Sequence, residues 1–169
     1  MKKSIIGAAM LTSLVVFISA AYAVGEDYKP VQQTPETQTV FVTGVSQANG
    51  TLTLTTDAID WYEGTEADRV FLEREPDSGL DATPDGYYIV NDDEQAKAYP
   101  VDPKAEVLMQ IYDHTGNIEE LDTNWNETIT LDKFASIFPN SDILDLSQFP
   151  YHLTITDGVV TKIVQQYIP

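Results

Sequence analysis

Acidic side chains gather in two short stretches near the middle of the chain, and both are candidate sites for a hard cation. The first stretch spaces three aspartates four residues apart: Asp77, Asp81 and Asp85. The second places three acids in succession: Asp92, Asp93 and Glu94. Calcium binds six to eight oxygen ligands, so we consider calcium for both stretches. The alternative for each is a solvated turn, because Asp and Ser are common turn residues.

Aromatic and amide side chains form a second candidate site, for an organic ligand. Its members are Trp61, Tyr87, Tyr88 and Asn91. Neighbouring residues on a strand point to opposite faces, so we expect one of the two tyrosines to be buried and the other exposed. The alternative is that these rings pack in the core with hydrogen-bonded polar tips.

The sequence contains no recognisable catalytic motif, and we assign no catalytic residue. The chain has no Cys, which excludes thiol catalysis, disulfides and Cys-based metal sites. Its two histidines, His114 and His152, cannot supply a three-histidine metal site. Nucleophile elbows, zinc-protease helices and phosphate loops are also absent. The 27 acids could still provide a glycosidase-like carboxyl pair, so a carboxylate-dependent hydrolase stays open.

The charge balance narrows the classes of partner. The chain carries 9 basic and 27 acidic residues, for a net charge of −18. Nucleic acids and anionic membrane surfaces are bound by clustered Lys and Arg, so neither is expected as a partner. A hydrophobic share of 43% is nevertheless typical of a globular domain.

The first 23 residues have the three-part layout of a secretory signal peptide. Two lysines, Lys2 and Lys3, precede an apolar run that ends in Ala21-Tyr22-Ala23. We expect cleavage after Ala23, which changes the net charge from −18 to −20. The remaining chain is then extracytoplasmic and is not inserted in a membrane. An uncleaved anchor is the alternative, because about 18 apolar residues can span a bilayer.

The rest of the chain is predicted to be a flexible lead-in, residues 24–39, followed by one domain, residues 40–169. A strand at 40–45, the turn Asn49-Gly50 and a strand at 51–55 predict a hairpin. Further strands are predicted at 87–91, 97–101, 106–112, 118–121, 151–156 and 159–168. In the last of these, Val160 and Ile163 can share a face only if a bulge separates them.

Two short helices interrupt the strands. Thr65 is the expected cap of the first, whose stripe is formed by Ala67, Val70, Phe71 and Arg74 before Pro76 ends it. Residues 77–85 are predicted to form a loop. The second helix is expected from Leu131 to Phe138, with Thr130 as its cap. Together, the pattern predicts a mostly β fold: a small antiparallel, closed barrel of about six to seven strands with two short helices.

Several segments, taken in order, resemble a group of uncharacterised secreted bacterial proteins. The shared segments are Trp61-Tyr62-Glu63-Gly64-Thr65-Glu66-Ala67, Gly86-Tyr87-Tyr88-Ile89-Val90-Asn91, Tyr99-Pro100-Val101, and Asp157-Gly158-Val159-Val160-Thr161-Lys162-Ile163. The likeness extends from about residue 41 to residue 167. It implies an exported bacterial domain and carries no activity, so it transfers no site residue.

Three hypotheses for the function therefore remain open. The first is a non-enzymatic, extracytoplasmic β-barrel module that binds cell-envelope material or another exported protein. The second is the carboxylate-dependent hydrolase, and the third is a calcium-dependent structural or adhesive module. No cofactor is expected under the first hypothesis.

Overall fold

A computed structural model describes residues 28–169, so the predicted signal peptide lies outside the described part of the chain. The strands are β1 (Thr37–Ala48), β2 (Thr51–Ala58), β3 (Asp60–Glu63), β4 (Tyr87–Val90), β5 (Ala96–Ile111), β6 (Thr123–Ile129), β7 (Pro150–Thr156) and β8 (Val159–Gln165). The helices are α1 (Gly64–Arg74) and α2 (Leu131–Ile137). Neither has the length and apolar character needed to cross a lipid bilayer.

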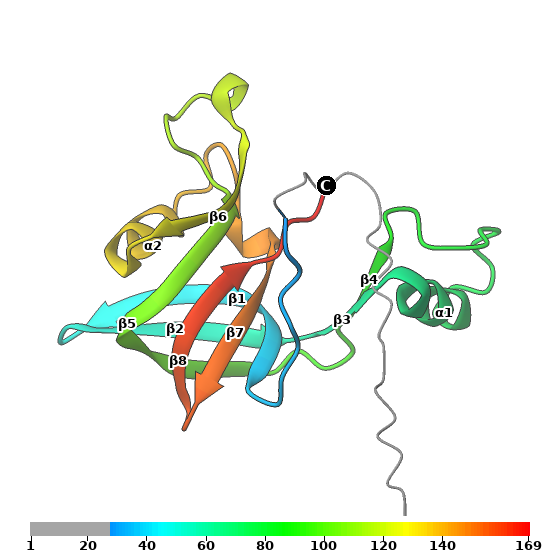
Figure 1. The fold of residues 1–169 in the computed structure, drawn as a ribbon, viewed down its shortest axis with the longest axis horizontal. Coiled ribbons are helices and arrows are strands. Elements are labelled where there is room, and N and C mark those ends of the chain that lie inside the picture. The colour runs from blue at the N-terminus through cyan, green and yellow to red at the C-terminus, as the bar shows by residue number, and fades with distance from the viewer. Residues whose placement is uncertain (1–27) are drawn as a thin grey trace, which may run out of the picture.

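Five of the strands close into a barrel in the order β1-β2-β5-β8-β7, with β7 returning to β1 (Figure 1). All pairs around the barrel are antiparallel except β5 and β8, which run parallel. The sixth strand, β6, extends the sheet from β5. The predicted mostly β fold with a closed barrel and two short helices is therefore confirmed, with five strands in the barrel itself.

The connectivity of the barrel is that of a known type of β fold. Counted along the chain, β1, β2, β5, β7 and β8 are the first to fifth barrel strands, and they follow one another around the barrel as 1-2-3-5-4. This is the Greek-key order of the OB-fold, a small five-stranded barrel. Such barrels carry many unrelated functions, so the fold alone assigns none.

The core fills the barrel with the inward-facing residues of every barrel strand. In the first hairpin the buried apolar residues alternate along each strand: Val40 and Val42 in β1, and Leu52 and Leu54 in β2. Helix α2 adds Phe134, which is completely buried and packs edge-on against Tyr151 of β7 at 6.0 Å. The helix therefore anchors the β6–β7 connection to the barrel.

The predicted bulge in the last strand is confirmed. Lys162 lies opposite Thr154, and Val160 lies opposite Ile155, so Thr161 has no partner across the β7–β8 ladder. The extra residue brings Val160 and Ile163 to the same face, and both are completely buried.

Residues 96–111 form one long strand, so the prediction of two strands at 97–101 and 106–112 was wrong. The first half of β5 pairs with β2, and the second half pairs with β6 and β8. Its register with β8 shifts between Val101 and Glu106, around Pro103. Proline is tolerated there because the strand bends as it passes from one partner to the next.

Two short strands were missed, and one was placed wrongly. Residues 118–120 form a 3-10 helix where a strand was predicted, and the strand follows at β6. Strand β6 is polar, and its Asn126 has a positive φ of 55°, so no alternation of apolar and polar residues marks this strand in the sequence. The other missed strand, β3, has only four residues before Gly64.

Both helices lie close to their predicted boundaries, but only one of the two predicted N-terminal caps is present. Thr130 caps α2 as predicted, with its hydroxyl accepting from the Lys133 amide at 3.1 Å. The expected cap of α1 was wrong, because that helix begins at Gly64 and has no side-chain cap. Its buried residues are nonetheless three members of the predicted stripe: Ala67, Val70 and Phe71.

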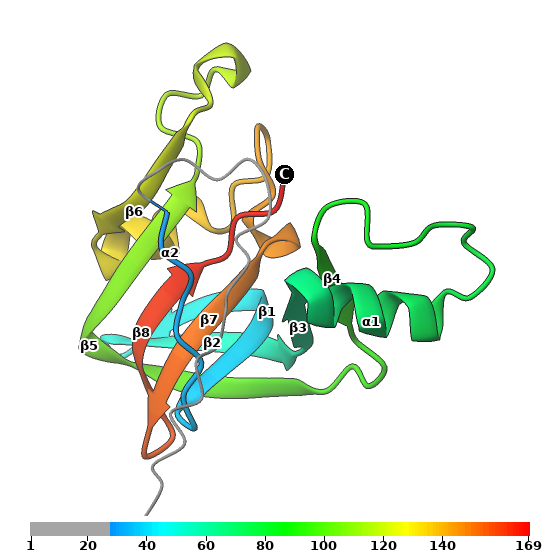
Figure 2. The same cartoon turned by 45° about the vertical axis from the view of Figure 1, so that its right-hand side comes forward.

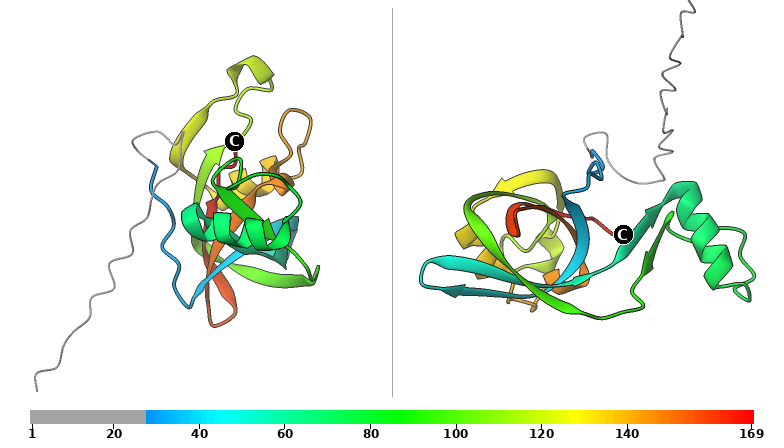
Figure 3. Two further views of the ribbon diagram at one scale, coloured as in Figure 1. Left: turned by 90° about the vertical axis from the view of Figure 1, so that its right-hand side faces the viewer. Right: turned by 90° about the horizontal axis from the view of Figure 1, so that it is seen from below.

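Residues 60–95, here called the insert, connect β2 to β5 and project from the barrel (Figures 2 and 3). In the insert, β3 and β4 form a two-stranded sheet with α1 beside it. Gly64 and Gly86 close the outer end of this sheet through an amide-to-carbonyl hydrogen bond of 2.9 Å. Both have positive φ, 57° and 73°, a conformation that side chains disfavour.

Candidate ligand-binding site

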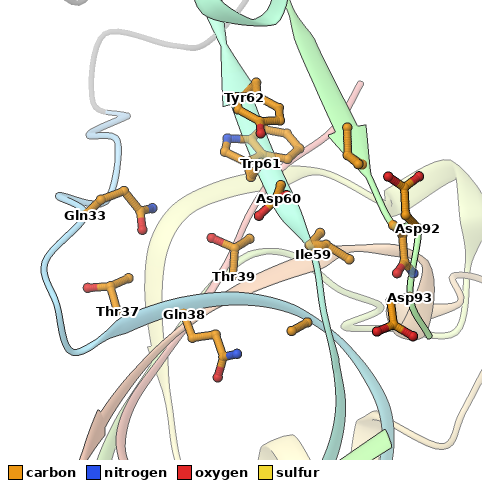
Figure 4. A pocket seen from close by; sticks show the side chains of 13 residues that line it. Gln33, Thr37, Gln38, Thr39, Ile59, Asp60, Trp61, Tyr62, Asp92 and Asp93 are labelled. Atoms are coloured by element: carbon orange, nitrogen blue, oxygen red, sulfur yellow. The ribbon is translucent and has the colours of Figure 1, made fainter. Parts of the chain in front are cut away.

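A pocket of about 490 Å³ lies between the barrel and the insert (Figure 4). We call it the barrel–insert pocket. One side is formed by the start of β1 and the chain before it, and the other by the two ends of the insert. Its lining residues are Gln33, Thr37, Gln38, Thr39, Ala58, Ile59, Asp60, Trp61, Tyr62, Val90, Asn91, Asp92 and Asp93. Pockets of 300–1,000 Å³ are typical of small-molecule sites.

Trp61 is the central aromatic residue of the pocket wall. Its ring stacks on Tyr87 of the neighbouring strand, with centroids 4.9 Å apart and planes 14° apart. It also meets the ring of His152 edge-on at 6.4 Å. Pairing of β3 with β4 produces this stack, because Trp61 lies opposite Ile89 and Glu63 lies opposite Tyr87. The wall is therefore held by strand pairing rather than by a loop.

A buried polar network lies behind this wall. His152 of β7 is only 3% exposed, and its Nε2 lies 2.9 Å from Oε1 of Gln166. Its Nδ1 lies 3.0 Å from the Thr39 hydroxyl and 3.2 Å from the Gln33 amide nitrogen. Because an amide oxygen can only accept, Nε2 carries the proton and Nδ1 accepts. Burial lowers the pKa of His152, against the opposing effect of its bond to Gln166.

The chain that precedes β1 is tied to the barrel by aromatic and polar contacts. The Tyr28 hydroxyl donates to Oε1 of Gln166 at 2.9 Å, and the Tyr28 ring meets Trp125 edge-on at 5.3 Å. Trp125 in turn meets Tyr167 at 5.3 Å. These contacts position Gln33 at the pocket, although residues 28–36 have no regular secondary structure.

Trp61 has one unsatisfied polar atom. Its indole Nε1 is buried and has no hydrogen-bond partner among residues 28–169. A small cavity of about 110 Å³ adjoins the residue, lined by Val31, Gln33, Trp61, Glu63, His152 and Gln166. A buried donor without a partner costs about 1–3 kcal/mol. The unpaired N–H of Trp61 therefore lowers the stability of the fold locally, although the ring remains part of the pocket wall.

Carboxylates form the rim of the pocket at the base of the insert. Arg74 of α1 binds both oxygens of Asp92, at 2.9 and 2.6 Å, and this hydrogen-bonded pair lowers the pKa of Asp92. Asp93 accepts from the Gln95 side chain at 2.6 Å. Asp60 is exposed and takes part in none of the ion pairs in the described part of the chain.

The structure brings together three of the four residues predicted to bind an organic ligand. Trp61 and Asn91 line the pocket, and Tyr87 supports Trp61. Tyr88 lies on the other face of the small sheet, where it packs on Phe71 at 5.6 Å and donates to Glu75 at 3.1 Å. The expectation of one buried and one exposed tyrosine was wrong, since both are half-buried. The physical reason is that both faces of this sheet are partly covered: Trp61 packs on Tyr87 on one face, and Phe71 packs on Tyr88 on the other.

Asn91 has a structural contact as well as a place in the pocket. Its amide donates to Asp57 of β2 at 2.7 Å, and the same carboxylate accepts from the Gln95 backbone at 2.9 Å. Asp57 is 8% exposed. It therefore fastens the returning end of the insert to the barrel and fixes one side of the pocket.

The two predicted acidic clusters do not converge on a metal site. Among residues 28–169, no three acidic, histidine or cysteine side chains are close enough to hold an ion. The first cluster is spread along an exposed loop after α1 and consists of Asp77, Asp81 and Asp85. In the second, Asp92 and Asp93 bind protein side chains at the pocket rim, and Glu94 is exposed. Regular spacing did not imply convergence, because the loop has no helical turn to bring positions four apart together.

Sequence reasoning missed the polar residues behind Trp61. Gln33 and Thr39 lie more than 100 residues before His152 and Gln166, and only the closed barrel brings the two segments together. One signal was present in the sequence. Gln165 and Gln166 come directly after the apolar residues Ile163 and Val164 of the last strand. Both are buried, and buried polar side chains need hydrogen-bond partners.

A second titratable cluster lies at the far end of β5. The Tyr112 hydroxyl donates to Glu127 at 2.6 Å, and His114 Nε2 lies 2.9 Å from the other oxygen of the same carboxylate. The rings of Tyr112 and His114 stack at 3.8 Å. Burial works to raise the pKa of Glu127, but hydrogen bonds from Tyr112, His114 and Asn124, together with the charge of His114, outweigh burial, and the pKa is lowered. The cluster holds the β5–β6 hairpin together.

In comparisons with known proteins, no family model matches the chain, and no curated protein or solved structure shows significant similarity to it. The site must therefore be interpreted from its own geometry. OB-fold barrels commonly bind ligands with the loops between strands 1 and 2 and between strands 4 and 5. Here both are tight turns, at Asn49-Gly50 and Asp157-Gly158, while the long insert after the second strand forms the pocket.

Proposed function

We propose that this protein is a non-enzymatic, extracytoplasmic module that binds a saccharide of the cell envelope in the barrel–insert pocket. The observation that carries the proposal is the pocket of about 490 Å³ with Trp61 in its wall. A pocket of this volume suits one or two sugar rings better than a protein surface, because protein interfaces are broad and shallow.

The chemistry of the lining supports this class of ligand. Aromatic rings offer an apolar face for the C–H groups of a sugar. Amides, hydroxyls and carboxylates can hydrogen-bond to its hydroxyl groups, and the pocket contains all three: Gln33, Gln38 and Asn91; Thr37 and Thr39; Asp60, Asp92 and Asp93. The predicted signal peptide and the resemblance to secreted bacterial proteins agree with an envelope ligand.

A hydrolase is less well supported by the same pocket. Glycoside hydrolysis needs one carboxyl group whose pKa is raised, so that it remains protonated and can donate a proton. Arg74 has the opposite effect on Asp92, because the ion pair lowers the pKa of this carboxyl. Asp92 is therefore suited to binding and structure rather than to acid catalysis.

Co-sedimentation of the purified protein with insoluble, protein-free cell-wall glycan tests the proposal. We expect wild-type protein and the Ile118→Ala variant to sediment with the glycan, because Ile118 is 66% exposed and does not line the pocket. Trp61→Ala and Gln33→Ala should each lower the affinity about tenfold or more, equivalent to about 1.4 kcal/mol. Gln33 lies outside the strands and helices, so its variant tests the pocket even if Trp61→Ala disturbs folding. No sedimentation of wild-type protein, or equal sedimentation of all variants, would contradict the proposal.

A further inference from the structure

We infer that the saccharide carries a free, positively charged amine, and that Asp60 binds it. This inference rests on the proposed function and specifies its ligand. Of the lining residues that the structure describes, three are aspartates and none is Lys, Arg or His. A neutral ligand would not need this bias, and an anionic ligand would be repelled by it.

Asp60 is the rim carboxylate that is free to contact a ligand. Arg74 already holds both oxygens of Asp92, and Gln95 holds one oxygen of Asp93. Asp60 makes no ion pair within residues 28–169. Asp60 directly precedes Trp61 in β3, and both residues line the pocket (Figure 4). An ammonium group placed there would gain a charge-assisted hydrogen bond.

The aromatic wall fits the same cation. Trp61 and Tyr62 follow Asp60 along β3, and all three residues line the pocket. Alternation along the strand places Asp60 and Tyr62 on the same face of β3. A cation within about 6 Å of such a ring is stabilised by the ring's quadrupole. An amine bound between the carboxylate and a ring would satisfy both contacts, and the amide groups of the pocket would remain for the hydroxyls.

The electrostatic field around the pocket acts in the same direction. The insert carries 12 of the 27 acidic residues of the chain but only two basic residues, Arg69 and Arg74. Both arginines are engaged in ion pairs with acids of the insert region: Glu66, Glu73 and Asp92. Clefts lined by one sign of charge raise the local concentration of the opposite ion. The insert therefore concentrates amine-bearing ligands at the pocket that it forms.

Isothermal titration calorimetry at about pH 6, where amines are charged, tests the inference. The probes are a chitosan tetrasaccharide, which has free amines, and its fully N-acetylated counterpart. We expect wild-type protein to bind the free-amine probe at least tenfold more tightly. Asp60→Asn should reduce this preference to about twofold or less. Asp77→Asn, which removes the same charge from an exposed position outside the pocket, should retain the preference.

The outcomes separate this inference from the function on which it rests. Equal binding of both probes would overturn the amine specificity and leave the saccharide module standing. Failure of both probes, together with failure of the glycan sedimentation, would overturn both. Tetralysine binding more tightly than the chitosan probe, with the same dependence on Asp60, would assign the pocket to a basic peptide and overturn the saccharide class.

Discussion

His152 of β7 and Gln166, just after β8, are joined by a hydrogen bond of 2.9 Å that fixes the buried imidazole in its neutral, Nε2-protonated form. The Thr39 hydroxyl and the Gln33 amide occupy the other ring nitrogen. Protonation of Nδ1 would place a proton against two donors in a site that is nearly closed to water. The network behind the pocket therefore depends on a neutral histidine.

This network predicts that acid destabilises the protein through His152. Its folded-state pKa is lowered, so below about pH 6.5 the unfolded chain binds a proton that the folded protein does not. The contribution is present above the unfolded pKa and is lost as the pH falls below it. Urea unfolding at pH 7 and pH 5 measures the effect. We expect His152→Gln to lose less stability between these two pH values than wild-type protein does, although it starts lower.

The other histidine provides the control. His114→Gln should keep the pH dependence that His152 confers, because His152 and its partners are unchanged. If His152→Gln and wild-type protein lose equal stability between pH 7 and pH 5, the neutral-histidine network is not the cause.

Two substitutions of Trp61 separate the stacking of its ring from the burial of its N–H. Trp61→Phe keeps an aromatic ring against Tyr87 and removes the donor that has no partner, so we expect the free energy of unfolding to change by less than about 1 kcal/mol. Trp61→Ala removes both, and should cost about 3–5 kcal/mol. Thermal unfolding followed by circular dichroism compares them. A large loss in Trp61→Phe would show that the indole nitrogen has a partner after all.

Phe71 should contribute most of the packing of α1. Its side chain is 8% exposed and lies against Tyr88, so Phe71→Ala is expected to cost about 3–5 kcal/mol. Arg69 lies on the exposed side of the same helix and bridges Glu66 and Glu73, which is worth little at a solvated surface. Arg69→Ala should therefore change stability by less than about 1 kcal/mol. Similar unfolding midpoints for the two variants would contradict the packing of α1.

Salt should stabilise the protein by screening its acidic surface. The net charge of −18 opposes the compact state, and the Debye length falls from about 30 Å at 0.01 M salt to about 10 Å at 0.1 M. We expect NaCl to raise the melting temperature over this range. Calcium and magnesium at matched ionic strength should act alike, since no three candidate ligands converge within residues 28–169. A rise specific to calcium, lost in Asp81→Asn or Asp93→Asn, would restore the calcium hypothesis.

Local sequence patterns predicted the elements that depend on local physics. The hairpin turn Asn49-Gly50 was identified, and the predicted strands at 151–156 and 159–168 lie on either side of the second turn, Asp157-Gly158. The Thr130 cap and the bulge beside Thr161 were identified as well. Each follows from backbone preferences or from side-chain alternation within about ten residues. The closed barrel also followed, because several short strands with one apolar face have few other ways to bury it.

The features that were missed depend on contacts between distant segments. Strand β6 is polar and exists because β5 offers it an edge, and β5 remains continuous through Pro103 because it changes partner there. Of the pocket, the sequence indicated Trp61 and Asn91 through their residue types. It could not indicate Gln33 or Thr39, which reach the site only when β7 has paired with β1.

The parallel pairing of β5 with β8 determines when the barrel can form. In this pairing Val101 of β5 lies opposite Val160 of β8. On the other side of the same hairpin, Tyr151 of β7 lies opposite Val40 of β1. The β7–β8 hairpin therefore completes the barrel by pairing with both β1 and β5. Until that hairpin is made, β1 and β5 each present an open edge to other chains. Folding must wait for contacts of high sequence separation, which places this domain among slow folders, on a scale of about milliseconds to seconds. A nascent chain of this protein is therefore most prone to aggregation just before residues 150–165 emerge.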